Sequence, residues 1–187
     1  PGQWTHAAEV GQDTWQFSTA AAHSPSHSLG AAGTTNLSDA SAVSPWIEIP
    51  TNAGQIRLEF HHQYNWGAHA TNRLDVGVLE CRRQGEAWQD VWAGELGNFF
   101  LAGAYRGVMS ATNVHPLSAR PVWSGNTSNN FVPVAFALSA GELAGRNVQF
   151  RWRQVTTSEL TTPRWYLDDV RLGVVTSATS TATFRVV

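Results

Sequence analysis

The stretch Trp-Tyr-Leu-Asp-Asp-Val-Arg-Leu, residues 165–172, places two adjacent carboxylates inside an otherwise apolar, alternating run. Alternation with a period of two residues predicts a core strand. One face of that strand would carry Tyr166, Asp168, Val170 and Leu172, and the other Trp165, Leu167, Asp169 and Arg171. Asp168 is therefore expected to point inward with its apolar neighbours.

A carboxylate in that position needs a partner, because an unpaired buried charge costs several kcal/mol. The chain has no lysine. A bound hard cation such as calcium is the interpretation that this pattern favours for Asp168. The alternative is a carboxylate satisfied by backbone N–H groups or by an arginine, with Asp169 as a surface charge.

The composition limits the class of protein. The length of 187 residues suits one β-rich domain with a single sizeable core. A net charge of -2, from 12 basic and 14 acidic residues, gives no electrostatic footprint for nucleic acid or for an anionic membrane. Nine tryptophans and a charged fraction of only 14% favour strands over helices.

The sequence also excludes a disulfide-stapled small fold and a membrane-spanning helix. Cys81 is the only cysteine, so no intrachain disulfide can form. No stretch approaches the roughly 18 apolar residues of a membrane-spanning helix. The first residues do not resemble a signal peptide, and the chain is expected to be a domain excised from a longer, secreted protein.

Alternating segments recur along the chain. The clearest is Gln55–Tyr64, with Ile56, Leu58, Phe60, His62 and Tyr64 on one face. Residues 73–83 repeat the pattern with Leu74, Val76 and Val78 inward, and residues 87–92 return across the turn 84–86 as a hairpin. Residues 41–50, 131–138 and 147–155 read as further strands, and 139–145 as a turn or one helical turn.

About ten short strands joined by turns predict an all-β fold, an antiparallel β-sandwich of the jelly-roll type. Residues 1–175 would form this domain. The Ser- and Thr-rich residues 176–187 would be a tail, either a linker or a strand belonging to a following domain. The Gly- and Asn-rich residues 93–130 are too irregular to order into strands, and long excursions of this kind are often functional.

Several short motifs occur in a characteristic order: residues 36–45 (Asn-Leu-Ser-Asp-Ala-Ser-Ala-Val-Ser-Pro), 58–62 (Leu-Glu-Phe-His-His), 138–145 (Leu-Ser-Ala-Gly-Glu-Leu-Ala-Gly), 148–152 (Val-Gln-Phe-Arg-Trp) and 165–170 (Trp-Tyr-Leu-Asp-Asp-Val). This order resembles the MAM-like jelly-roll domains appended to secreted bacterial peptidases, including those of the immune-inhibitor-A type. More loosely, it resembles calcium-containing jelly-roll carbohydrate-binding modules. The resemblance covers roughly residues 4–174.

The resemblance implies a non-catalytic accessory domain of a secreted multidomain hydrolase, with a structural calcium. Its partners would be neighbouring domains of the same polypeptide. Asp168 would be the first calcium ligand and Asp39 a second, with backbone carbonyls completing the six to eight oxygens that calcium takes. An Asp in a turn also caps its own backbone, which is the other interpretation of Asp39.

A binding surface is the second functional hypothesis, with a polysaccharide or a protein as its ligand. Tryptophans in or near loops can stack on a sugar ring or a peptide, and the candidates are Trp66, Trp88, Trp92 and Trp123. The alternating polar positions Arg57, Glu59 and His61, together with Gln149, Arg151 and Arg153, would form a ligand face if their strands were neighbours. Core tryptophans and a merely solvated sheet face are the alternatives.

Catalysis is the third hypothesis. The chain lacks His-Glu-x-x-His, Gly-x-Ser-x-Gly and Cys-x-x-Cys motifs. A carboxylate pair made of Glu59 with Glu80 or Asp75 could in principle hydrolyse or cleave glycosides. His61 and His62 are expected on opposite faces of one strand and so cannot jointly chelate one ion. Cys81 reads as a small buried apolar group.

Overall fold

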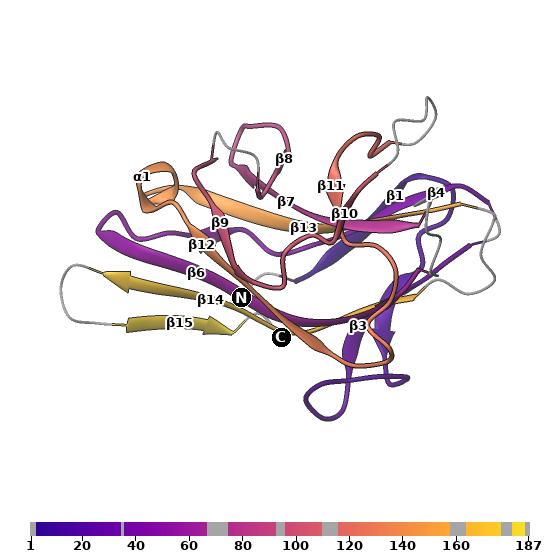
Figure 1. Cartoon of the computed structure of the whole chain (residues 1–187). Coiled ribbons are helices and arrows are strands. Elements are labelled where there is room, and N and C mark those ends of the chain that lie inside the picture. Colours follow the sequence, from indigo (N-terminus) through magenta and orange to yellow (C-terminus); the bar gives the residue numbers. More distant parts are fainter. Residues whose placement is uncertain are drawn as a thin grey trace.

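The computed structural model describes residues 3–34, 36–66, 75–92, 96–109, 116–157, 164–176 and 181–185, the last range for its backbone alone. Two antiparallel sheets pack face to face over these residues, which confirms the predicted β-sandwich (Figure 1).

In the described part of the chain, one sheet has seven strands in the order β2-β3-β14-β6-β12-β9, with β15 also paired to β14. Their bounds are β2 Trp15–Ser18, β3 Ser28–Ala32, β6 Ala53–Asn65, β9 Phe99–Ala102, β12 Val132–Leu138, β14 Arg164–Thr176 and β15 Thr181–Arg185. The long strands β14 and β6 lie side by side at its centre, with Leu167 opposite His62.

The second sheet has six strands in the order β1-β4-β13-β7-β8, with β5 also paired to β13, in the described part of the chain. These are β1 Thr5–Val10, β4 Ser38–Val43, β5 Ile47–Glu48, β7 Val76–Arg83, β8 Gln89–Asp90 and β13 Asn147–Thr156. A two-stranded ribbon of β10 Gly107–Val108 and β11 Pro121–Val122 lies beside this sheet, above β13 and β7 in the view of Figure 1.

The main core lies between the two sheets and consists largely of aromatic rings. The inward face of β6 is the predicted one, since Phe60 and Tyr64 are both buried. From the opposite sheet, Trp152 meets the edge of Phe60 with ring centres 5.5 Å apart. His62 lies among these rings at 1% exposure, and burial lowers its pKa to about 3, so it is a neutral core side chain at neutral pH.

The inward face of β7 differs from the prediction. Val76 and Val78 point to the outer side of the six-stranded sheet, where they form a second small core with Met109, Leu117, Val122 and Val155. Gly77 instead faces the main core, where a Cβ would lie only 2.5 Å from Trp66 and 2.8 Å from Trp165. Residues 105–109 and 116–122 cover part of the outer face, so Val76 and Val78 are buried on that side of β7 as well. Leu74 lies outside the described residues.

The ends of other elements also refine the prediction. The predicted strand 41–50 corresponds to the end of β4 and to β5, and Pro45 lies in the break between them because proline cannot donate to a strand ladder. In the tail, the backbone of Thr181–Arg185 pairs antiparallel with Arg171–Val175 of β14.

The predicted helical turn is α1, Ala140–Leu143. At four residues α1 is far too short to cross a bilayer, and no other helix in the described ranges has the length and apolar character for it.

Candidate functional site

A β-bulge in β14 determines where the two carboxylates point. Asp168 lies opposite His61 of β6 and Arg171 opposite Glu59, so Asp169 and Val170 together face the single residue between them. Asp169 takes up the extra residue with a positive φ of 52°, a conformation that Asp tolerates better than most residues.

The bulge also shifts the alternation that the sequence showed. Trp165 and Leu167 face the core before it, and Val170 and Leu172 face the core after it. Asp168 is therefore on the outer face of the seven-stranded sheet, and the prediction that it points inward is wrong. It is nonetheless buried, at 5% exposure, because residues 19–27 cross over it.

Backbone N–H groups satisfy the Asp168 carboxylate. Its Oδ2 accepts hydrogen bonds from the N–H groups of His23 and Ser24, at 2.7 and 3.0 Å, and its Oδ1 accepts one from the N–H of Asp169 at 2.7 Å. These bonds fasten the segment 19–27 to β14. They match the alternative interpretation of the sequence, a carboxylate satisfied by backbone donors.

Asp169 lies beside two histidines, and it is not the solvated surface charge that the sequence suggested. Its Oδ2 is 2.7 Å from Nδ1 of His23 and 3.9 Å from Nδ1 of His61, and Ser24 Oγ donates to both of its oxygens at 2.8 Å. Burial by itself would raise the pKa of Asp169, but the hydrogen bonds from His23 and Ser24 outweigh it and hold that pKa below its usual value.

The two imidazoles stack on one another, with ring centres 3.7 Å apart and ring planes within 8°. Burial and the neighbouring His23 lower the pKa of His61. His61 and His62 lie on opposite faces of β6, as predicted, because His62 points into the core.

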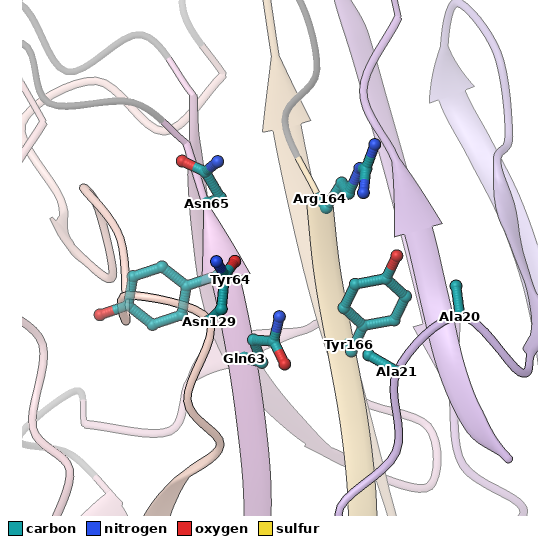
Figure 2. A pocket seen from close by; sticks show the side chains of 8 residues that line it. All are labelled: Ala20, Ala21, Gln63, Tyr64, Asn65, Asn129, Arg164 and Tyr166. Atoms are coloured by element: carbon teal, nitrogen blue, oxygen red, sulfur yellow. The ribbon is translucent and has the colours of Figure 1, made fainter. Parts of the chain in front are cut away.

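A cleft of about 390 Å³ opens on the same outer face, directly beside this cluster. Figure 2 shows the two paired strands beneath it: Gln63 and Asn65 project from β6, and Arg164 and Tyr166 from β14. Ala20 and Ala21 of the segment 19–27 close one side, and Tyr64 and Asn129 complete the lining. The cleft thus gathers two strands and two distant loops.

The Tyr166 ring lies over a glycine of the neighbouring strand. Gly30 of β3 is directly opposite Tyr166, and a Cβ at that position would come within 2.9 Å of the ring. Because Gly30 has no side chain, the ring can pack closely against β3 beside the cleft. This contact gives the cleft one aromatic wall with a fixed orientation.

The outer face of the six-stranded sheet carries an ion-pair network. Glu80 is 2% exposed and accepts from Arg151 and, at 2.6 Å, from Arg120, while Arg153 lies 3.6 Å away. Arg153 also binds both oxygens of Asp39, at 2.7 and 2.6 Å. Arg151 and Arg153, two of the predicted ligand residues, are therefore engaged with carboxylates.

Beside this network, aromatic and guanidinium groups alternate in a stack, the Trp46–Arg82–Trp88 ladder. The Arg82 guanidinium lies 5.1 Å from the centre of the Trp46 ring and 4.3 Å from that of Trp88. The guanidinium of Arg151, a member of the ion-pair network, lies 4.7 Å from the centre of the Trp88 ring. Trp46 is 43% exposed. Trp46 could not be singled out from the sequence, because its partner Arg82 comes from the distant strand β7.

The four predicted tryptophans have different positions. Trp66 and Trp123 are core residues: Trp66 stacks on Tyr64, and the Trp123 indole donates to the carbonyl oxygen of Gly103. Trp88 is part of the ladder and is half-buried. Trp92 is 47% exposed and packs against Phe100 and Tyr105. Only Trp88 and Trp92 therefore offer a surface to a ligand.

The predicted polar ligand face does not form. Arg57 and His61 belong to β6 in one sheet, and Arg151 and Arg153 to β13 in the other. Arg57 makes an exposed ion pair with Glu59 at 2.7 Å. The two polar stripes therefore lie on separate sheets, and only His61 is near the cleft.

The proposed carboxylate pairs are not brought together either. Glu59 is on the outer face of the seven-stranded sheet, whereas Glu80 belongs to β7 in the other sheet. Asp75 is buried next to β7 and accepts a hydrogen bond from the backbone N–H of Thr157. Burial raises the pKa of the Cys81 thiol to about 12, which makes it a poor nucleophile.

The two predicted calcium ligands lie in different sheets, Asp39 in β4 and Asp168 in β14. Three N–H groups bind Asp168, and a guanidinium binds both oxygens of Asp39. Calcium requires six to eight oxygen ligands, and these carboxylates face hydrogen-bond donors instead. The donor set therefore does not fit calcium, which stays a prediction of the sequence.

The fold is similar to that of a solved structure, although no family model and no curated protein matches the sequence. A carbohydrate-binding module solved in complex with β-1,4-galactotriose, TmCBM61, superposes with a TM-score of 0.53 at 9% sequence identity. The match covers 97% of this chain and 88% of that one, so the two share their β-sandwich over almost the whole length.

Proposed function

We propose that this domain binds a polysaccharide, and that the cleft over the paired strands β6 and β14 is its binding site. The observation that carries the proposal is the convergence of Gln63, Asn65, Asn129 and Arg164 on one cleft beside the ring of Tyr166. A volume of about 390 Å³ is within the range of small-ligand sites and suits one or two sugar rings.

The lining has the chemistry that sugars need. Each amide side chain offers both a donor and an acceptor, and a sugar hydroxyl both donates and accepts, so amides can bind hydroxyls in pairs. A guanidinium adds donors in a fixed plane, and an aromatic ring packs against the C–H face of a pyranose. The structural similarity to a module that binds β-1,4-galactotriose supports this class of ligand and suggests β-1,4-galactan as the first probe.

The experiment is calorimetric titration of the domain with β-1,4-galactotriose and with a panel of soluble polysaccharides. Gln63→Ala and Arg164→Ala should each weaken binding by roughly fivefold to tenfold, because a lost hydrogen bond is worth about 1–1.5 kcal/mol. Arg57→Ala is the matched control, since Arg57 lies on the same face of β6 outside the cleft. Equal losses in all three variants, or no saturable binding to any polysaccharide, would overturn the proposal.

A second candidate is the accessory role in a secreted hydrolase that the sequence resemblance implies, in which the domain docks another domain of the same polypeptide. The Trp46–Arg82–Trp88 ladder supports this role, because an exposed indole stacked on a guanidinium is typical of a protein interface. The Trp46→Ala variant tests this role. If it no longer binds a partner domain or a sugar, while the cleft variants bind as well as the wild type, the Trp46–Arg82–Trp88 ladder is the binding surface.

A further inference from the structure

We infer that His23, His61 and Asp169 form a binding site for a divalent transition metal, with zinc as the best probe. The inference does not depend on the cleft binding a sugar. Among the described residues, these three form the one group of three or more His, Cys, Asp or Glu side chains whose ligand atoms all lie within 4.8 Å of one another. Two imidazoles and one carboxylate are a donor set that zinc accepts, with a water in the fourth position.

The ligand atoms lie close together, and the stacked His23 ring would have to rotate for both imidazoles to bind one ion in their ring planes. Zinc–ligand distances of about 2.0–2.2 Å at tetrahedral angles place ligand atoms ~3.3–3.6 Å apart. The Asp169 oxygen is 2.7 Å from Nδ1 of His23, which is shorter than this range, and 3.9 Å from Nδ1 of His61, which is longer. An ion would enter by replacing the first contact, and His23 has the freedom to adjust because its side chain is 41% exposed.

An unsatisfied ring nitrogen points to the same place. Nδ1 of His61 is buried and has no hydrogen-bond partner, although the rest of the side chain reaches solvent. A buried polar atom without a partner is unusual in a folded protein, because its desolvation is not compensated. A metal ion bound between Nδ1 of His61 and the carboxylate of Asp169 would satisfy it.

The surroundings resemble the outer shell of a metal site. Ser24 Oγ donates to both oxygens of Asp169 and so fixes the orientation of the carboxylate. Asp168 holds the backbone of His23 and Ser24 in place, and it adds a second negative charge next to a divalent ion. Hydrogen bonds of this kind to metal ligands are what orient and tune them.

The site would fasten the segment 19–27 to the sheet. His23 and Ser24 come from that segment, His61 from β6 and Asp169 from β14. Ala20 and Ala21 of the same segment wall the cleft. A bound metal would therefore hold that wall in place as well as cross-link the segment to two strands.

The test is metal binding by untagged protein that has been dialysed against a chelator. Titration with zinc should show one ion bound per chain, and cobalt(II) should give the intense visible bands of a tetrahedral site. His23→Ala and His61→Ala should each weaken zinc binding by more than about tenfold, and Ser24→Ala, which removes an outer-shell contact, by about 10-fold or more. Zinc should also slow amide hydrogen exchange in residues 20–24.

His6→Ala is the matched control and should leave zinc binding unchanged. Nδ1 of His6 lies 2.6 Å from Oδ2 of Asp13, so this pair also places a histidine beside an aspartate, but it does not belong to a group of three ligand residues. His23→Ala alters an exposed side chain, and its circular dichroism spectrum and melting curve check that the variant folds. The absence of zinc binding, or zinc binding that is equal in the wild type and in His23→Ala and His61→Ala, would overturn the inference.

Discussion

Oδ2 of Asp168 accepts a hydrogen bond of 2.7 Å from the backbone N–H of His23, which precedes it by 145 residues. Through this bond and its neighbours a buried carboxylate of β14 holds the segment 19–27 against the sheet. That segment supplies a wall of the cleft and one imidazole of the His23–His61–Asp169 cluster. Both proposed sites therefore depend on Asp168.

Asp168→Ala should lower the free energy of unfolding by about 2 kcal/mol or more, because removing the acceptor leaves N–H donors unpaired at roughly 1–3 kcal/mol each when they are buried. Urea denaturation measures the change, and hydrogen exchange should show the N–H groups of His23 and Ser24 exchanging faster. Asp13→Ala is the control: Asp13 also accepts from a backbone N–H, that of Trp15, but is itself exposed. A smaller loss for Asp168→Ala than for Asp13→Ala would contradict the role given to Asp168.

The buried Glu80 should be among the most sensitive positions outside the main core. Glu80→Gln removes the buried carboxylate that Arg151 and Arg120 share and leaves them only the more exposed Glu9 and Asp90, so the free energy of unfolding should fall by about 3–5 kcal/mol. Glu86→Gln, which breaks an exposed pair with Arg83, should cost less than about 1 kcal/mol. Equal effects of the two substitutions in urea denaturation would show that the network is not buried in solution.

The same residue predicts a dependence on pH. Burial by itself would raise the pKa of Glu80, but Arg151 and Arg120 outweigh it and hold the pKa below its usual value. A carboxylate with a lower pKa in the folded state stabilises the fold above its unfolded pKa of about 4.3, and this contribution is lost as the pH falls through the folded pKa. The difference in stability between the wild type and Glu80→Gln should therefore be full at pH 7 and shrink in acid. A difference that grows below pH 4 would have the wrong sign.

The close packing at Gly77 gives a prediction about the core. A Cβ there would meet Trp66 and Trp165, so Gly77→Ala should cost about 1–3 kcal/mol by overpacking. Gly141→Ala in α1 is the matched control, because its nearest neighbour, Ser139 Oγ, would be 3.7 Å away, and alanine favours helix. Thermal unfolding compares the two. An unchanged melting temperature for Gly77→Ala would mean that the tryptophans can move apart.

Zinc, but not calcium, should raise the melting temperature. Since the donor sets at Asp168 and Asp39 do not fit calcium, calcium added to chelator-treated protein should leave the melting temperature unchanged. Zinc at 100 times its dissociation constant should add about 2.7 kcal/mol of stability. A rise with calcium that disappears in Asp168→Asn would instead support the calcium site that the sequence predicted.

The sequence predicted the fold well where alternation is regular. In β6 the inward residues from Ile56 to Tyr64 follow the predicted period, because the strand has one core face and one outer face. In β14 the prediction fails at the bulge, since a residue that adopts a positive φ leaves no mark in the hydrophobic pattern. In β7 it fails because residues such as Met109, Leu117 and Val122 bury Val76 and Val78 from outside, a non-local contact that alternation cannot reveal.

The candidate sites were harder to predict because they are assembled from distant segments. His61 was a candidate ligand from its exposed position on β6, but its partner His23 lies in a segment with no periodic pattern. The cleft residues Gln63 and Arg164 are ordinary polar residues near strand ends until the register places their strands side by side. Asp168 stood out correctly as a buried carboxylate, although its partners are backbone N–H groups, which a sequence cannot show.

The most direct test of the proposed function is a nuclear magnetic resonance titration of isotope-labelled domain with β-1,4-galactotriose, followed at side-chain groups. The cleft predicts saturable shifts in the side-chain amides of Gln63, Asn65 and Asn129 and in the Arg164 guanidinium, with the Trp46 and Trp88 indoles unchanged. Shifts confined to those two indoles and to Arg82 would place the ligand on the opposite sheet and contradict the assignment of the cleft.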